Sequence, residues 1–232
     1  MKSLLSASDA AAVRTLLRVS RDEFLNETGK QWHGLNAYPS TVQKKFGTRS
    51  CYFTGSNCYL RPLSTLKLGG SDFAIAFWAY IDATNTSGEW AATFFNESKT
   101  GGIAIGINAS NKARFTWMRS SSVVIDSASS STPTFTAGTW HHYEVDYKNS
   151  TNTLYFFLDG SLITSGTADV FDTEAYYPQS YFGYNILATD ATFKGYIDEV
   201  LITNKILHTA NFTKPTTTYT ADSSTIALLH FE

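Results

Sequence analysis

The strand pattern of this sequence is clearest at residues 73–81, which read FAIAFWAYI. The odd-numbered positions form one apolar series, and residues two apart on a strand share a face. The same period of two recurs farther along, at residues 103–108, 115–118 and 142–147. Residues 154–158, LYFFL, end at Asp159-Gly160, the strongest signal for a tight hairpin in the chain. Short strands that each have one apolar face predict an antiparallel β-sandwich.

The composition favours an all-β protein and excludes several other classes. Of the 232 residues, 15% are aromatic and 16% are charged, and the formal net charge is −2. Disordered chains have few aromatic residues and a high net charge, and nucleic-acid binders carry basic patches, so neither class fits. No apolar run approaches the about 18 residues of a membrane span. We expect one globular domain over residues 13–232, in which segments 13–19 and 225–231 pair.

The two cysteines flank a turn. Between Cys51 and Cys58, residues 54–57 read TGSN, and we interpret the residues on either side as the ends of two paired strands. In that register the thiols are diagonal neighbours about 7–8 Å apart, which exceeds the usual reach of a disulfide. We therefore favour two buried free thiols over a disulfide.

Four segments resemble the motifs of laminin G-like, concanavalin A-like lectin/glucanase domains of the type found in bacteriophage-associated proteins. Residues 45–60, KFGTRSCYFTGSNCYL, are similar to the opening motif KFGxSxxFxG…YL. Residues 72–80 resemble DFTIEFWVY, residues 140–143 with 154–160 resemble WHH…LYVDG, and residues 195–200 with 211–215 resemble GYIDEV…NFTPP. The resemblance covers residues 13–232 and implies a jelly-roll sandwich of two curved antiparallel sheets. A fold of this kind does not by itself give a function.

The sequence departs from these motifs at two positions. Ala76 stands where the family strand carries Glu, and Glu144 stands where another family strand carries Ala. The polar residue therefore stands on a different strand than in the family motifs. For this reason we transfer no ligand contact of the family to Ala76 or to Glu144.

The carboxylates do not complete a glycosidase motif, so we expect no enzymatic activity. Glycoside hydrolysis uses two carboxylates about 5–10 Å apart, which the related β-glucanases place on one strand as Glu-x-Asp-x-x-Glu. Here no third carboxylate follows Glu144-Val145-Asp146, and the adjacent Asp198 and Glu199 should point to opposite faces of their strand. A Ser-His-Asp site stays open, although no Gly-x-Ser-x-Gly elbow is present.

His142, Glu144 and Asp146 share one face of a predicted strand. A metal or acid–base cluster is one interpretation of this spacing. We favour the other, a solvated face of an exposed strand, because the outward faces of antiparallel strands are usually polar.

A structural calcium ion is the one cofactor that the resemblance raises. Calcium is held by carboxylates and backbone carbonyls, and the candidate ligands are Asp198 on the closing strand and Asp22 after the first strand. No Asp-x-Asp-x-Asp run accompanies them. The alternative is that Asp198 accepts local hydrogen bonds.

Sugar binding would use aromatic rings that the core does not need, because such rings stack on the apolar faces of sugars. Tyr176 and Tyr177 precede a proline and predict a loop, and Trp90 lies where a loop enters a strand. Trp117 and Arg119 share the face of a strand that leads into a Ser-rich segment. These five residues are our candidate ligand-binding residues, and packing against a neighbouring loop is the alternative for each.

We expect a non-catalytic surface, adhesion or decoration module of a phage virion. The N-terminus does not resemble a secretion signal, since Asp9 follows closely on the apolar Leu4-Leu5. A lectin-like module made in the host cytoplasm suits a particle that leaves by lysis. Residues 1–12 would then form an arm that binds virion proteins or sister subunits, and the expected ligand is a cell-surface glycan. The alternatives are a bacterial carbohydrate-binding module or surface lectin, and a glucanase-type hydrolase.

Overall fold

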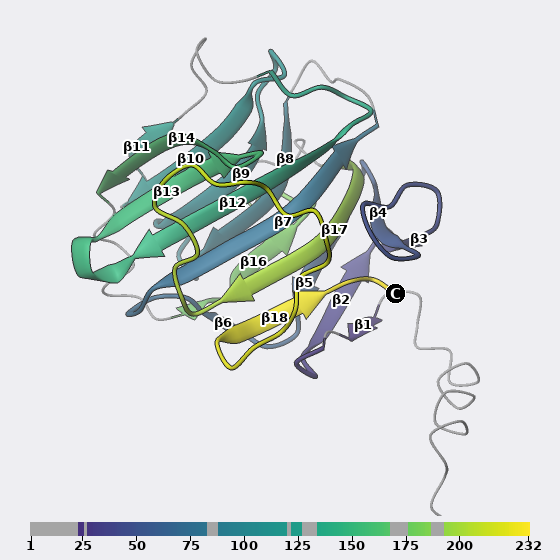
Figure 1. Ribbon diagram of the computed structural model, residues 1–232, viewed down its shortest axis with the longest axis horizontal. Helices are drawn as coiled ribbons and strands as arrows, with labels where there is room; N and C mark the ends of the chain where they lie inside the picture. The colour runs from purple at the N-terminus through teal and green to yellow at the C-terminus, as the bar shows by residue number, and fades with distance from the viewer. Residues whose placement is uncertain are drawn as a thin grey trace, which may run out of the picture.

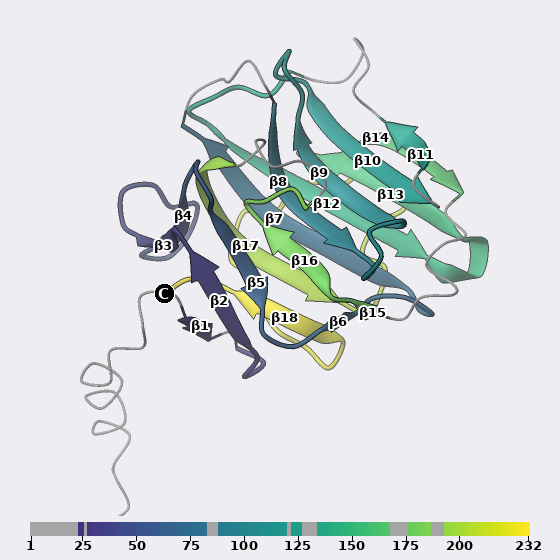
Figure 2. The same cartoon turned by 180° about the vertical axis from the view of Figure 1, so that it is seen from behind.

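A computed structural model gives the chain as a sandwich of two antiparallel sheets (Figure 1, Figure 2). It describes residues 23–25, 27–82, 88–119, 122–126, 134–167, 176–186 and 193–232. The predicted all-β class and its two-sheet architecture are confirmed. Among the described residues, no helix is long and apolar enough to cross a membrane. The arm predicted at residues 1–12 and the strand predicted at 13–19 lie outside them.

Each sheet contains eight strands. The first sheet has the order β1 (Glu23–Leu25), β2 (Gln31–Leu35), β5 (Tyr59–Pro62), β16 (Gln179–Phe182), β8 (Glu89–Phe95), β9 (Gly102–Ile107), β10 (Ala113–Arg119) and β11 (Ser122–Asp126). The second has the order β14 (Ser161–Thr167), β13 (Thr153–Leu158), β12 (Trp140–Lys148), β7 (Phe73–Ile81), β17 (Lys194–Thr203), β4 (Ser50–Thr54) and β3 (Ala37–Ser40), and β18 (Thr225–Leu229) also pairs with β17. The remaining elements are the paired strands β6 (Leu66–Lys67) and β15 (Tyr176–Tyr177) and the short 3-10 helix η1 (Asn149–Thr151).

The core fills the space between the two sheets. The strand predicted at residues 73–81 is β7, and its odd-numbered side chains all belong to the core, as predicted. Phe77 of β7 stacks on Tyr143 of β12 with ring centroids 5.5 Å apart and meets the edge of Phe182 of β16 at 5.4 Å. Because β16 belongs to the first sheet, this aromatic group joins the two layers.

The predicted Asp159-Gly160 hairpin is confirmed between β13 and β14. Asp159 and Gly160 have φ angles of +51° and +80°, and positive φ at both central residues is what a type I′ turn requires.

The predicted pairing around the two cysteines is wrong. β4, which contains Cys51, belongs to the second sheet, whereas Cys58 directly precedes β5 of the first sheet. Residues 55–58 therefore cross from one layer of the sandwich to the other instead of forming a hairpin. Both cysteines are buried free thiols, and Cys58 donates its S–H to the carbonyl oxygen of Phe193 at 3.3 Å.

A long segment covers the outer face of the second sheet, where we expected solvent. We call residues 204–224, which connect β17 to β18, the strap. It passes in front of β13, β12, β7 and β17 as the thin yellow-green trace in Figure 1. The interpretation of His142, Glu144 and Asp146 as a solvated face is therefore wrong, since these residues are 0%, 1% and 0% exposed.

The closing segment pairs within the second sheet. β18 pairs with β17, and the carbonyl oxygen of Leu228 in β18 accepts a hydrogen bond from the backbone N–H of Glu27 at 3.1 Å. The connection between β1 and β2 therefore contacts the last strand near the C-terminus.

Candidate functional site

The strap is held over the second sheet by acidic side chains of β12. Asp146 Oδ1 accepts hydrogen bonds from the backbone N–H groups of Leu207 at 2.6 Å and of His208 at 3.2 Å. Glu144 Oε1 accepts a hydrogen bond from His208 Nδ1 at 2.5 Å. The imidazole of His208 is fixed from its other side by Phe212, whose ring is stacked on it at 3.6 Å between centroids. We call Glu144, Asp146 and His208 the latch.

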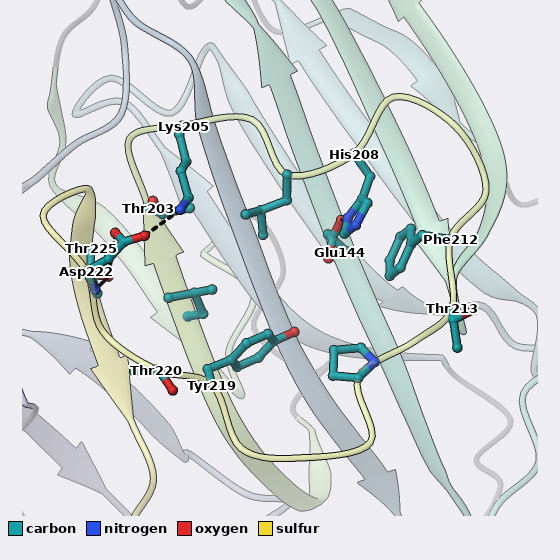
Figure 3. Close-up of a pocket in the computed structure, with 13 residues that line it drawn as sticks. Glu144, Thr203, Lys205, His208, Phe212, Thr213, Tyr219, Thr220, Asp222 and Thr225 are labelled. Carbon is teal, nitrogen blue, oxygen red and sulfur yellow. Dashed lines mark hydrogen bonds and ion pairs between the residues drawn. The ribbon is translucent and has the colours of Figure 1, made fainter.

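The strap encloses a cavity beside the latch. Figure 3 shows the strap running in a ring past Lys205, His208, Phe212 and Tyr219, with Glu144 below His208. The cavity has a volume of about 230 Å³, and Leu201 and Thr203 of β17 contribute to its wall. It is therefore a hollow bordered by the strap, and Glu144 and His208 both line it.

A shared proton explains the two neighbouring acids of the latch. Burial raises the pKa of Glu144 to about 7, and burial together with the charge of Glu144 raises the pKa of Asp146 to about 9. Two carboxylates this close cannot both ionise readily, so the pair keeps a proton at neutral pH. No N–H or O–H among the described residues pairs with Asp146 Oδ2, and the shared proton gives this oxygen a partner.

A second buried contact fixes the far end of the strap. His142 Nε2 lies 2.6 Å from the hydroxyl of Tyr219, and burial lowers the pKa of His142 to about 3. The imidazole is therefore neutral, and its Nε2 shares a hydrogen bond with the tyrosine hydroxyl. The backbone N–H of Tyr219 donates to Glu199 Oε2 at 2.8 Å, so Tyr219 is held through both its side chain and its backbone.

The prediction that Asp198 and Glu199 point to opposite faces is wrong because β17 contains a bulge between Asp198 and Leu201. Glu199 has a φ of +51° and is the extra residue of this bulge. Its carboxylate binds the strap at Tyr219 and also accepts from His230 Nδ1 at 2.6 Å. Without the bulge, the side chain of Glu199 would point into the core. The bulge turns it to the outer face of the sheet, where it binds the strap.

Asp198 accepts local hydrogen bonds, which was the alternative to calcium binding. Its Oδ2 accepts from the backbone N–H groups of Lys45 and Phe46 at 2.8 and 3.2 Å, and its Oδ1 accepts from that of Glu199 at 2.9 Å. Burial nevertheless raises the pKa of Asp198 to about 7. Both carboxylate oxygens of Asp198 thus accept hydrogen bonds from backbone N–H groups in this structure. The second candidate, Asp22, lies outside the described residues.

The latch offers the donors of a transition-metal site. Glu144, Asp146 and His208 can each offer one ligand atom, and these atoms lie within 4.8 Å of one another. Two carboxylate oxygens and an imidazole nitrogen suit zinc or manganese better than calcium. In this structure, however, His208 Nδ1 binds Glu144, and Asp146 Oδ1 binds two backbone N–H groups of the strap. In the observed arrangement, the latch residues therefore connect the strap to the sheet.

The two departures from the family motifs lie side by side. Glu144 of β12 is the direct cross-strand partner of Ala76 of β7. The exchange of Glu and Ala between the two strands therefore keeps one carboxylate and one small residue at the same place in the sheet. The sequence alone does not show that these two positions are neighbours, whereas the register does.

Two of the five predicted ligand-binding residues are part of the core. Tyr177 is 0% exposed and Trp117 is 1% exposed, and both rings pack between the sheets. Neither ring offers a face to a ligand. The side chains of Tyr176 and Arg119 lie outside the described part of the structure.

Of the three predicted ligand-binding residues whose side chains are described, Trp90 is the one that reaches the surface. It is half-buried in β8, and the guanidinium carbon of Arg114 in β10 lies 4.9 Å from its ring centroid. Gly106 of β9 pairs with both residues and lies between them. Because Gly106 has no side chain, Arg114 can reach across β9 to Trp90. The structure does not bring Trp90 together with Trp117 or Tyr177, which point into the core.

Sequence reasoning missed the strap residues. His208 and Tyr219 lie in a stretch without strand periodicity, and nothing in their spacing connects them with β12. One signal was available. Glu144 and Asp146 alternate on a strand whose sheet partner, β7, is apolar on both faces, and this pattern indicates that the outer face of the sheet is covered.

The shared proton predicts how stability depends on pH. Because folding raises the pKa values of the pair, the folded protein holds a proton that the unfolded chain loses near about pH 4. The contribution of the pair to stability is therefore greatest below about pH 4. It falls progressively as the pH rises and is lost once the pH has passed the folded pKa values of about 7 and about 9. Glu144→Gln can bind both His208 and Asp146 without this proton. Its stability relative to wild type should thus increase from about pH 5 to about pH 9, measured by urea unfolding.

Two controls accompany this measurement. Glu144→Ala leaves His208 and Asp146 without their partner and should cost about 3 kcal/mol. The exposed Glu97→Gln should leave the pH dependence unchanged. A constant difference between Glu144→Gln and wild type over this pH range would contradict the shared proton.

Comparisons with known proteins place this fold in a family. Residues 54–211 match the Laminin_G_3 family model, described as the concanavalin A-like lectin/glucanases superfamily. No curated protein sequence matches the chain.

Solved structures are similar at low sequence identity. Domain 4 of AbnA, an extracellular GH43 arabinanase from Geobacillus stearothermophilus, has a TM-score of 0.55 at 18% identity over 76% of this chain and 79% of that one. The CBM40 of a Ruminococcus gnavus sialidase has a TM-score of 0.50 at 9% identity over 72% and 95%. A Trypanosoma rangeli sialidase reaches 0.60 at 10% identity over 82% of this chain but only 30% of its own length. These likenesses concern the fold, and the family match covers more than half of the sequence. The chain therefore belongs to the concanavalin A-like lectin/glucanases superfamily.

Proposed function

We propose that this protein is a non-catalytic, lectin-like adhesion or decoration module of a bacteriophage particle that binds carbohydrate on the host cell. The observation that carries the non-catalytic part is the use of Glu144 and Asp146. They are the one Glu-x-Asp pair in the sequence, they are buried under the strap, and they bind strap atoms. A glycosidase instead presents two carboxylates on either side of the substrate bond.

Sugar binding is supported by the fold. The arabinanase domain was solved in complex with arabinotriose, and the CBM40 was solved bound to α2,6 sialyllactose. Sandwiches of this shape therefore provide surfaces for glycans, and we extend the property to this chain. The viral assignment rests on the resemblance of its motifs to domains of phage-associated proteins. In that setting residues 1–12 would join the domain to virion proteins or to sister subunits.

The non-catalytic proposal predicts binding without turnover. On a glycan array the purified protein should bind at least one glycan. In a reducing-end assay it should release no sugar from arabinan, β-glucan or sialyllactose. Release of sugar that is lost in Glu144→Gln and in Asp146→Asn would contradict the proposal, because it would place catalysis at the latch.

The viral proposal predicts where the protein is found. An antibody to the domain should label purified phage particles in immuno-electron microscopy. A chain that lacks residues 1–12 should stay folded by circular dichroism but no longer assemble onto particles. Labelling of the bacterial envelope, with none on particles, would instead support the alternative of a bacterial surface lectin.

A further inference from the structure

Five aromatic residues form a continuous row across the second sheet. Each belongs to a different strand, and each is the direct cross-strand partner of the next. In order along the row they are Tyr38 of β3, Tyr52 of β4, Tyr196 of β17, Tyr80 of β7 and Trp140 of β12. We call this row the ladder.

The rings of the ladder touch one another without a gap. Successive centroids are 5.5, 4.7, 5.8 and 5.6 Å apart, and the planes are tilted or edge-on to each other. These separations lie in the range of favourable aromatic contacts. The ladder is therefore an ordered surface whose rings are held in place by their neighbours before any ligand arrives.

The ladder lies on the outer face of the sheet and beyond the latch. Tyr80 of β7 lies between Ala79 and Ile81, which both point into the core. The buried strap contacts of β12 fall at positions 142–146, whereas Trp140 is the first residue of that strand. Tyr38 is 41% exposed, and Tyr52, Tyr80 and Trp140 are also partly exposed. Only Tyr196, in the middle, is nearly covered, at 7%.

The charges beside the ladder favour an uncharged ligand. Burial raises the pKa values of Tyr52 and Tyr196, and the negative charge of Asp82 raises them further. The tyrosines therefore keep their hydroxyl protons and remain hydrogen-bond donors. Burial raises the pKa of Asp82, and the positive charge of Lys194 lowers it in turn, so these two opposite charges near the row offset each other. The row therefore lies beside a balanced pair of charges, which favours neither an acidic nor a basic ligand.

We propose that the ladder is a stacking platform for an extended chain of uncharged sugars. Five neighbouring strands span four intervals of about 4.8 Å, or about 19 Å, which gives room for several sugar units in a row. Aromatic rings suit the apolar faces of sugars, and we assign the binding to these rings. The inference rests on the proposed carbohydrate binding and adds the place and the ligand class.

Variants at the open end of the row provide the test. Tyr38→Ala and Tyr52→Ala each remove one ring, and Tyr52→Phe keeps the ring while removing its hydroxyl. Tyr155→Ala is the matched control, because Tyr155 is a partly exposed tyrosine on the same sheet at an outward position of β13, outside the row. Trp90→Ala tests the candidate on the first sheet. Thermal unfolding verifies the fold of each variant, and affinity electrophoresis uses soluble arabinan, xylan, β-glucan and, as the acidic probe, polygalacturonate.

The expected result is binding of wild type to a neutral polysaccharide and not to polygalacturonate. Tyr38→Ala and Tyr52→Ala should each lose about tenfold in affinity, which corresponds to about 1.4 kcal/mol. Tyr52→Phe and Tyr155→Ala should bind within about twofold of wild type.

Three results would overturn the proposal in different ways. If the folded ladder variants bind sugar as tightly as wild type, the sugar site lies elsewhere and the proposed function still holds. A loss of sugar affinity in Trp90→Ala would then place the site on the first sheet. Preference for polygalacturonate would refute the ligand class. Failure of wild type to bind any of the glycans would refute both the platform and the proposed carbohydrate binding. In that case a change in oligomeric state in Tyr38→Ala would identify the ladder as a contact between protein subunits.

Discussion

The structure depends on the pairing of buried carboxylates with the strap. A carboxyl group without partners is costly to remove from water, and Glu144, Asp146 and Glu199 are all almost fully buried. The strap supplies the donors that compensate for this burial, namely three backbone N–H groups and one imidazole. In turn, these acids give a segment without regular secondary structure a fixed path across the sheet. Neither part would hold its arrangement without the other.

This pairing also determines which parts of the second sheet are available for function. The strap occupies the middle of the outer face, where an open sheet could have formed a cleft lined by Glu144 and Asp146. What remains beside the latch is a hollow of about 230 Å³. The end of the sheet at which β12 begins carries the partly exposed ladder. On this sheet the acidic side chains bind the strap, and the aromatic rings of the ladder are partly exposed. This arrangement fits ligand binding better than glycoside hydrolysis.

Local features were predictable from the sequence, and contacts between distant segments were not. The alternation at residues 73–81 predicted β7, and Asp159-Gly160 predicted the hairpin of β13 and β14, because both signals lie within a few adjacent residues. The burial of Glu144 and Asp146 depends on His208, more than 60 positions away, in a stretch without periodicity. The bulge at Glu199 reverses the alternation on which the expectation for Asp198 and Glu199 was based. The ladder was hidden for a similar reason, since each of its five strands contributes a single ring and only the register aligns them.

Hydrogen exchange at the strap tests the central claim most directly. The amide protons of Leu207, His208 and Tyr219 bind buried carboxylates, so at neutral pH they should exchange only as fast as the core strands β7 and β12 open. The neighbouring amides of the exposed residues 209–211 provide the internal comparison. Exchange of Leu207, His208 and Tyr219 as rapid as that of the exposed amides would show that the acids of the sheet do not hold the strap, which would contradict the central claim.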